Sequence, residues 1–306
     1  MTSKSIVILI FCFVTNSILS QSDIKVSSFF LSPLTYNPAY AGSYEYITIS
    51  SFYSSQWVGF DGAPKTININ AHGTFLGPNT GLGIEFINDE IGVTSTTKVL
   101  MNYAYHLRLN KNWNLSMCIK AGTSYNSVNY GLLNIENPIN YPRSNTLVNN
   151  LNPNIGTGLF LHNDKFFFGL GIPNLLKNKF ADNFKTTLAN STPNYYVSTG
   201  YSFDLNNNIQ LQPSLLTRIV KGSPVNTLLA TTLNWKEKFY SSINLDFNAS
   251  VGAFVGFRFL DIYMIGYSYD TSINNFSNSN NGIHSFFLNI RFNDYWGRKR
   301  CSCYSF

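Results

Sequence analysis

Four histidines are the side chains of this sequence best suited to acid–base chemistry, and they lie on four different predicted strands: His72, His106, His162 and His284. A general base needs a nucleophile or a carboxylate within hydrogen-bond reach. Glu85 and Asp246 also lie on predicted strands, but their spacing brings neither to a histidine. We therefore expect these groups to join a polar hydrogen-bond network, and we predict that the protein is not an enzyme.

Metal and phosphate sites have equally weak support. Asp89 and Glu90 are adjacent in a predicted loop, but they lack the glycine-punctuated acidic repeat of a calcium loop. The Gly-Leu-Gly segments 81–83 and 169–171 are not followed by a helix, so they do not form a phosphate cradle. We expect these glycines to let a neighbouring strand or a plug approach the wall closely. No cofactor and no metal are predicted.

The four cysteines do not form a disulfide framework. Cys12 lies in a predicted signal peptide and Cys118 lies on the polar face of a predicted strand. Cys301 and Cys303 are close together near the C-terminus, without the further ligands that a zinc site needs. We interpret them as incidental; the alternative is a labile redox or attachment role.

The elements that position all these side chains are strands, as segment 66–75 shows most clearly. Its residues alternate strictly between an apolar set (Ile67, Ile69, Ala71, Gly73, Phe75) and a polar set (Thr66, Asn68, Asn70, His72, Thr74). Successive side chains of a strand point to opposite faces, so this segment has one apolar and one polar face. The polar face lies either on the outside of a soluble sandwich or on the inside of a membrane barrel.

The composition favours the barrel. Charged residues make up 12% of the chain and aromatic residues 16%, whereas charged residues reach about 25% in ordinary globular domains. A barrel wall that contacts outer-membrane lipid has less water-facing surface, and it carries Tyr and Trp at its two interfaces. The net charge of +6 is small for 306 residues, so we expect no nucleic-acid partner.

The sequence divides into four segments. Residues 1–20 have the charged head, apolar core and small final residues of a signal peptide. Residues 21–46 form a periplasmic or lumenal N-terminal segment, and its aromatic content indicates that it packs into or under the barrel. Residues 47–292 form the transmembrane barrel. Residues 293–306 form a basic periplasmic tail.

We predict an all-β, transmembrane outer-membrane β-barrel of about fourteen antiparallel strands. The predicted strands are 47–57, 66–75, 81–88, 96–108, 113–125, 155–162, 166–172, 195–205, 209–219, 226–235, 239–247, 251–259, 262–270 and 283–292. Their connections mostly alternate in length, and the exception is 248–250, which is tight on the side of the longer loops. Short turns are expected at 76–80, 109–112, 163–165, 206–208, 236–238 and 260–261, and longer loops at 57–65, 89–95, 126–154, 173–194 and 271–282. Outer-membrane barrels have short periplasmic turns and longer extracellular loops.

Three blocks of sequence carry a resemblance to a known family. They are residues 37–43 (NPAYAGS), 56–66 (QWVGFDGAPKT) and 81–92 (GLGIEFINDEIG). Together with shorter later blocks, they resemble the PorP/SprF family of Bacteroidetes outer-membrane proteins. The family-motif positions are Asn37, Pro38, Tyr40, Gly42, Gln56, Trp57, Gly59, Phe60, Gly62, Pro64, Lys65, Asn88, Asp89 and Gly92.

The resemblance implies a function that the residues alone do not. It implies a non-enzymatic outer-membrane component of the type IX secretion system, which supports the secretion and surface anchoring of adhesins, including gliding adhesins. It also implies contact with the periplasmic secretion machinery and with a secreted adhesin. The alternative is a passive outer-membrane pore or small-solute transporter, since about fourteen strands can enclose a water-filled lumen.

Overall fold

The computed structural model describes residues 29–43, 46–132, 147–177, 179–181, 187–190, 192–247, 249–273 and 281–293. The predicted signal peptide and most of the C-terminal tail, with Cys12, Cys301 and Cys303, lie outside these residues. Three short helical elements come first: η1 (Phe29–Leu31), α2 (Pro33–Tyr36) and η2 (Pro38–Tyr40).

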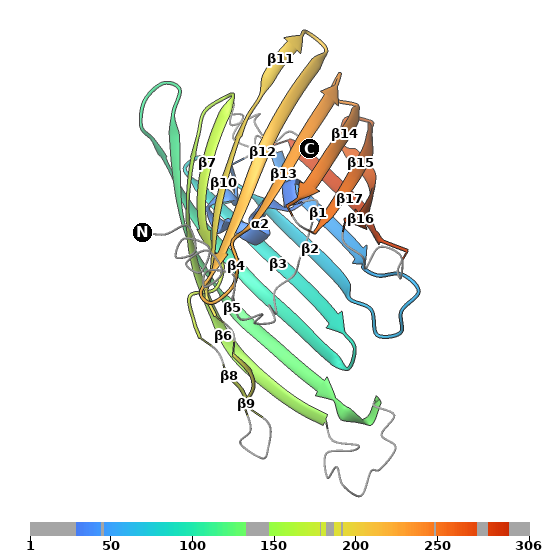
Figure 1. The fold of residues 1–306 in the computed structure, drawn as a ribbon. Coiled ribbons are helices and arrows are strands. Elements are labelled where there is room, and N and C mark those ends of the chain that lie inside the picture. Colours follow the sequence, from blue (N-terminus) through green and yellow to red (C-terminus); the bar gives the residue numbers. More distant parts are fainter. Residues whose placement is uncertain are drawn as a thin grey trace, which may run out of the picture.

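The strands form a closed antiparallel barrel (Figure 1). They are β1 (Tyr46–Ser55), β2 (Lys65–Gly73), β3 (Thr80–Ile91), β4 (Thr94–Arg108), β5 (Asn114–Asn129), β6 (Leu147–His162), β7 (Phe166–Ile172), β10 (Asn194–Tyr201), β11 (Phe203–Asn206), β12 (Ile209–Val220), β13 (Asn226–Trp235), β14 (Phe239–Asp246), β15 (Ser250–Phe259), β16 (Tyr263–Ser272) and β17 (Ile283–Asn293). The pairing of β1 with β17 and of β10 with β12 closes the wall.

The prediction of a fourteen-strand barrel is confirmed. Among the described residues the sheet contains 15 strands. Of these, β10 and β11 are separated only by Ser202 and both pair with β12, so they form one interrupted strand. Among the described residues, no helix is both long and apolar enough to cross a membrane.

Two predicted loops are wrong. The loop expected at 89–95 is only a two-residue turn, because β3 and β4 pair as far as Ile91 and Thr94. Segment 126–154 was expected to be a long loop after a strand ending at residue 125, because it is rich in asparagine. Instead, β5 and β6 continue into it and pair as far as Asn129 and Leu147. Local composition favours a turn, but pairing with a neighbouring strand satisfies the backbone, and this tertiary pairing overrides the propensity. In segment 173–194 the structure adds a small hairpin of β8 (Lys179–Ala181) and β9 (Thr187–Asn190).

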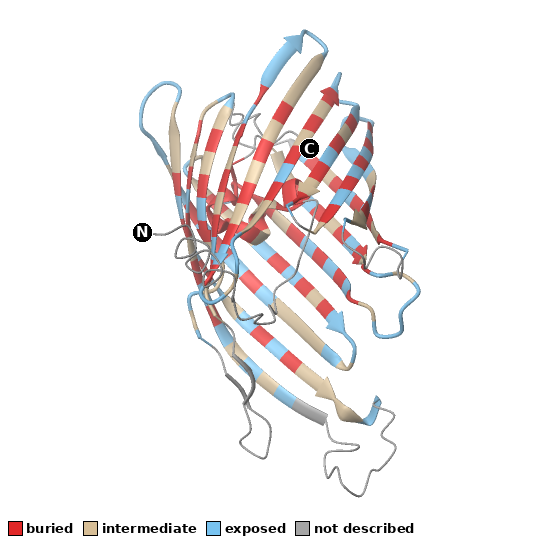
Figure 2. Cartoon of the chain, viewed as in Figure 1, coloured by how far each residue is buried: buried red, intermediate tan, exposed pale blue. Residues whose placement is uncertain are grey.

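The two faces of the wall follow the predicted alternation. On β2, Asn68, Asn70 and His72 are buried, while Ile67 and Ile69 are exposed. Figure 2 shows the same exchange of buried and exposed residues along most strands. The polar set therefore faces the interior of the barrel, and the exposed apolar set forms the surface that contacts lipid.

Candidate functional site

Residues 29–43, called the plug below, lie inside the barrel. Figure 1 shows α2 within the ring of strands. Phe29, Phe30 and Leu34 are buried in one cluster with residues of the wall. Both α2 and η2 begin with a proline, which is tolerated in the first helical turn but prevents a longer helix through the segment. The plug is therefore a chain of single turns that crosses the lumen.

A buried ion pair lies at the centre of the contact between the plug and the wall. Lys120 Nζ on β5 lies 2.8 Å from Glu85 Oε2 on β3, and both side chains are almost completely buried. Thr35 of the plug donates a hydrogen bond of 2.6 Å to Glu85 Oε1. Asn68 on β2 donates to the same carboxylate oxygen (3.1 Å) and to the Thr35 hydroxyl (2.8 Å). A buried charge needs such partners to offset its desolvation.

A second set of hydrogen bonds joins the plug to the wall further along the chain. The Asn37 side-chain amide donates to the Leu159 carbonyl at 2.9 Å, and its Oδ1 accepts from the Ala39 N–H at 3.1 Å. One asparagine thus caps η2 and also connects it to β6. On β2, the Asn70 side-chain amide donates to the Ser32 hydroxyl at 3.3 Å.

Glycines in the wall make room for the plug backbone. A Cβ atom at Gly81 would collide with the Ala41 carbonyl, and one at Gly171 would collide with the Tyr36 carbonyl. A Cβ at Gly158 would collide with the Asn37 side chain. The Gly-Leu-Gly segments were expected to allow a close approach to the wall. In the structure, the segment that approaches them is the plug. Only a residue without a Cβ atom permits this distance.

Aromatic rings fill the space between the plug and the opposite walls. Phe30 makes an edge contact with Phe254 on β15 at 5.7 Å between ring centroids. Tyr36 meets Tyr196 on β10 at 5.2 Å, and Tyr40 meets Phe160 on β6 at 5.5 Å. Such edge contacts stabilise beyond the apolar area that they bury. The plug therefore contacts strands on several sides of the lumen.

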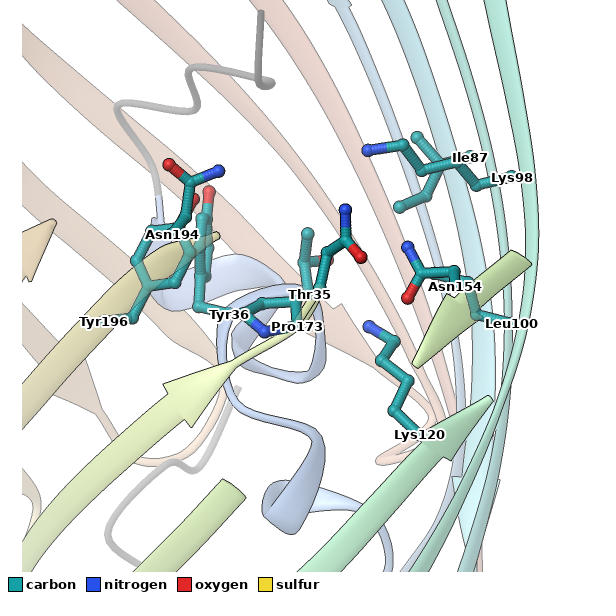
Figure 3. A pocket seen from close by; sticks show the side chains of 11 residues that line it. Thr35, Tyr36, Ile87, Lys98, Leu100, Lys120, Asn154, Pro173, Asn194 and Tyr196 are labelled. Atoms are coloured by element: carbon teal, nitrogen blue, oxygen red, sulfur yellow. The ribbon is translucent and has the colours of Figure 1, made fainter. Parts of the chain in front are cut away.

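The cavities that border the plug are small. Their volumes are about 40, 10 and 20 Å³, whereas small-molecule sites occupy several hundred Å³. Figure 3 shows the largest, where Lys98, Lys120 and Asn154 extend from the wall toward Thr35. A space of this size and polarity suits a few water molecules. None of these three cavities is large enough to form a water-filled channel through the lumen.

The histidines do not assemble a catalytic centre among the described residues. His106 Nδ1 lies 2.6 Å from the Ser116 hydroxyl, but Ser116 is completely buried, so no substrate can reach it. His72 accepts a hydrogen bond from the Gly42 N–H at 3.4 Å, and His284 lies 2.6 Å from the Tyr267 hydroxyl. These contacts are those of a structural hydrogen-bond network. No metal-binding group of three or more His, Cys, Asp or Glu side chains occurs in the described part of the chain.

The family-motif positions fall into two regions. Asn37, Pro38, Tyr40 and Gly42 belong to the plug. The remaining positions lie in the loop 56–64, at the start of β2, at the end of β3 and in the turn that follows it: Gln56, Trp57, Gly59, Phe60, Gly62, Pro64, Lys65, Asn88, Asp89 and Gly92. We call this second region the outer-loop motif. The Gly92 N–H donates to the Gly62 carbonyl at 2.8 Å, which joins two sequence blocks that lie apart in the chain.

Sequence reasoning missed the Glu85–Lys120 pair and the role of Thr35. A signal for the pair was present, since both charges occupy inward positions on strands separated only by β4. Finding the pair requires the register of both hairpins, because Glu85 lies opposite Leu100 whereas Lys120 lies opposite Asn102. No such signal existed for Thr35, because the path of the plug through the lumen is not encoded in strand periodicity.

Comparisons with known proteins agree with this architecture. The sequence matches the family described as "Type IX secretion system membrane protein PorP/SprF" over residues 18–290. No curated protein sequence matches it. The structure is similar to the CymD monoaromatic hydrocarbon channel, with a TM-score of 0.53 and 8% identity over 91% of this chain and 96% of CymD. It also matches the toluene transporter TbuX of Ralstonia pickettii, with a TM-score of 0.49 and 7% identity over 87% of this chain and 94% of TbuX. At 8% identity, the likeness to CymD concerns the fold alone.

Proposed function

Because the chain belongs to the PorP/SprF family of type IX secretion system membrane proteins, we propose that this outer-membrane barrel is a non-catalytic support for the secretion and surface anchoring of adhesins, including gliding adhesins. In this proposal the outer loops and rim contact the secreted adhesin. The short turns and the N-terminal segment contact the periplasmic part of the machinery.

The observation that carries this proposal is the filled lumen. A passive pore needs a continuous water-filled path, but the plug is held in the lumen by the Glu85 carboxylate, by the Leu159 carbonyl and by aromatic contacts with the opposite wall. Removing the plug would expose buried aromatic side chains and leave the Glu85–Lys120 pair without Thr35. A closed barrel suits a component whose work is done by its two rims.

The outer-loop motif offers a surface to which a secreted adhesin could bind. Its backbone is ordered by hydrogen bonds from the Gln56 N–H to the Pro64 carbonyl (2.9 Å) and from the Gly92 N–H to the Gly62 carbonyl (2.8 Å). Trp57 and Phe60 remain 37% and 44% exposed. Aromatic side chains on a rigid backbone are favourable anchors for a protein partner, because little conformational freedom is lost on binding.

Two measurements test the proposal. A strain that lacks the gene should secrete and display less adhesin on its surface, and expression of the intact chain should restore both; normal display in the deletion strain would contradict the support role. Purified protein in a planar bilayer should show no steady conductance. A stable open-channel current would favour the passive pore instead.

A further inference from the structure

Strand β11 has an unpaired edge. β10 pairs with β7 on one side and with β12 on the other. Its ladder with β7 ends at the pair Tyr201–Phe166, where the short turn 163–165 begins. After Ser202 the strand continues as β11, which pairs only with β12 among the described residues. Beyond the end of β7, no described strand lies next to β11 on that side.

The backbone groups of Asp204 point to this open edge. The Ser202 N–H donates to the Lys165 carbonyl at 2.7 Å, so the backbone groups of Ser202 face the β7 side. Along a strand, successive residues direct their N–H and C=O groups to opposite edges. Asp204 therefore directs its N–H and C=O away from β12, to the side on which the turn 163–165 lies.

The open edge lies at the rim of the barrel. Figure 1 shows β11 and β12 extending past the neighbouring hairpins, at the end that carries the short turns, and Figure 2 colours β11 as exposed. The ring of Phe203 lies 4.6 Å from that of Tyr201, an outward aromatic pair typical of a membrane interface. Unpaired backbone groups cost several kcal/mol each in hydrocarbon, so this edge is in water on the periplasmic side.

The charge at the edge indicates the kind of partner. Lys165 Nζ lies 3.0 Å from Asp204 Oδ2, and both side chains are about half exposed. Asp204 therefore already has a basic neighbour on the side where a new strand would be added. Two copies of β11 paired about Asp204 would place two carboxylates opposite each other, which is destabilising. A segment without an acidic residue opposite Asp204 is therefore favoured over a second copy of this chain.

We propose that β11 binds an extended segment of a periplasmic component of the secretion machinery as an added strand. The segment alternates apolar and polar residues, to match Phe203 and Leu205 on one face of β11 and Asp204 on the other. Backbone hydrogen bonds to Asp204 supply the attraction, and side-chain alternation supplies the register. The partner rests on the proposed function, whereas the open edge is a property of this chain.

The test uses proline to remove a single backbone donor. Asp204→Pro deletes the N–H that faces the open edge, at a position where the ladder with β12 does not need it. The control, Asp204→Ala, keeps the N–H and loses only the carboxylate. A photo-crosslinking amino acid replaces Asn207, in the turn after β11, in the full chain expressed in the deletion strain.

We expect the parent and Asp204→Ala to crosslink to a periplasmic component of the type IX machinery. Asp204→Pro should reduce this adduct about tenfold, which corresponds to the loss of one hydrogen bond. Equal crosslinking by the proline variant, or an adduct only with a second copy of this chain, would overturn the proposal. If Asp204→Pro does not fold, hydrogen exchange at the Asp204 amide of the parent replaces it. Exchange should slow when the machinery co-purifies, and an unchanged rate would also overturn the proposal.

Failure of this inference is distinguishable from failure of the proposed function. If the deletion strain loses adhesin display but Asp204→Pro crosslinks and restores display as well as the parent, the support role stands and the added strand does not exist. If the deletion strain displays adhesin normally, the support role itself fails, whatever the behaviour of β11.

Discussion

The plug and the outer-loop motif both carry family-motif positions, but the structure fixes them in different ways. The plug is held by side chains: Thr35 binds the Glu85 carboxylate and Asn37 binds the Leu159 carbonyl, in a buried environment. The outer-loop motif is held by backbone hydrogen bonds such as that from Gly92 to Gly62, and it leaves Trp57 and Phe60 substantially exposed.

This difference separates two reasons why a residue type is needed. In the plug, replacing a side chain removes a contact that keeps the lumen filled. Such a substitution should therefore lower the free energy of unfolding. In the outer-loop motif, replacing an exposed aromatic side chain leaves the backbone contacts intact. Such a substitution should therefore weaken binding to a protein partner. Substitutions in the plug and in the wall beneath it should therefore change the free energy of unfolding more than substitutions in the outer-loop motif.

The largest effect is expected from Lys120→Met. This change leaves the Glu85 carboxylate buried without its cation, and removing one partner of a buried pair costs about 3–5 kcal/mol. Urea unfolding of the purified barrel in detergent measures the loss. The matched control is the double variant Lys120→Met/Glu85→Gln, which removes both charges and should recover most of the stability. If the single and double variants are equally stable, the unpaired Glu85 carboxylate costs nothing, and the ion pair does not stabilise the barrel.

The second effect is expected from glycines under the plug. Gly81→Ala and Gly171→Ala add a methyl group where a Cβ atom would collide with plug carbonyls, and such overpacking costs about 1–3 kcal/mol. The strain should shift or partly expel the plug, so both variants should conduct in a planar bilayer more often than the parent. Ala253→Val, which enlarges an outward-facing residue on β15, is the control and should not change conductance. Unchanged conductance in all three would mean that the plug tolerates the added methyl group.

Much of the fold was accessible from the sequence, because strand periodicity reports directly on the two faces of a barrel wall. The alternation from Thr66 to Thr74 predicted the inward and outward residues of β2 correctly, and the family resemblance of the motif blocks is confirmed by the match over residues 18–290. The outer-membrane location was predicted from the composition and from the alternation of short turns and longer loops. It is confirmed by the family and by the CymD-like fold.

The arrangement of the lumen was less accessible, because it depends on contacts between residues far apart in the sequence. The aromatic content of segment 21–46 predicted that it packs on the barrel. Of its described residues 29–43, Phe30 and Tyr36 contact the wall, whereas residues 21–28 lie outside the described part of the chain. The partners of Thr35 and Asn37 lie 50 and 122 residues away. No local pattern specifies those pairings. The same limit explains the error at 126–154, where strand pairing extended β5 and β6 beyond their local propensity.

A smaller effect is expected from Asn37→Ala. The variant loses the cap on the Ala39 N–H and the hydrogen bond to the Leu159 carbonyl, which together should cost about 1–2 kcal/mol. Urea unfolding measures this loss, and limited proteolysis within residues 29–43 should become faster. The control is Asn110→Ala, because Asn110 makes a similar side-chain cap in the exposed turn after β4. Asn110→Ala should leave proteolysis of the plug unchanged. Equal protection of the plug in both variants would show that Asn37 is dispensable.

The smallest stability effect and the clearest functional one are expected at the outer-loop motif. Phe60→Ala removes an aromatic side chain that is 44% exposed, while the hydrogen bond between Gly92 and Gly62 does not involve it. Surface substitutions of this kind change the free energy of unfolding by no more than about 0.5 kcal/mol. Truncation of an aromatic anchor in a protein interface, in contrast, costs about 2 kcal/mol or more of binding energy. We therefore expect normal unfolding in urea together with reduced surface display of adhesin, measured by labelling intact cells.

The matched control is Phe239→Ala, at an exposed aromatic residue beside the short turn 236–238, away from the outer loops. If Phe60→Ala lowers stability and leaves display intact, the contrast between the two regions is reversed at this residue, and the aromatic side chain orders the loop rather than binding a partner.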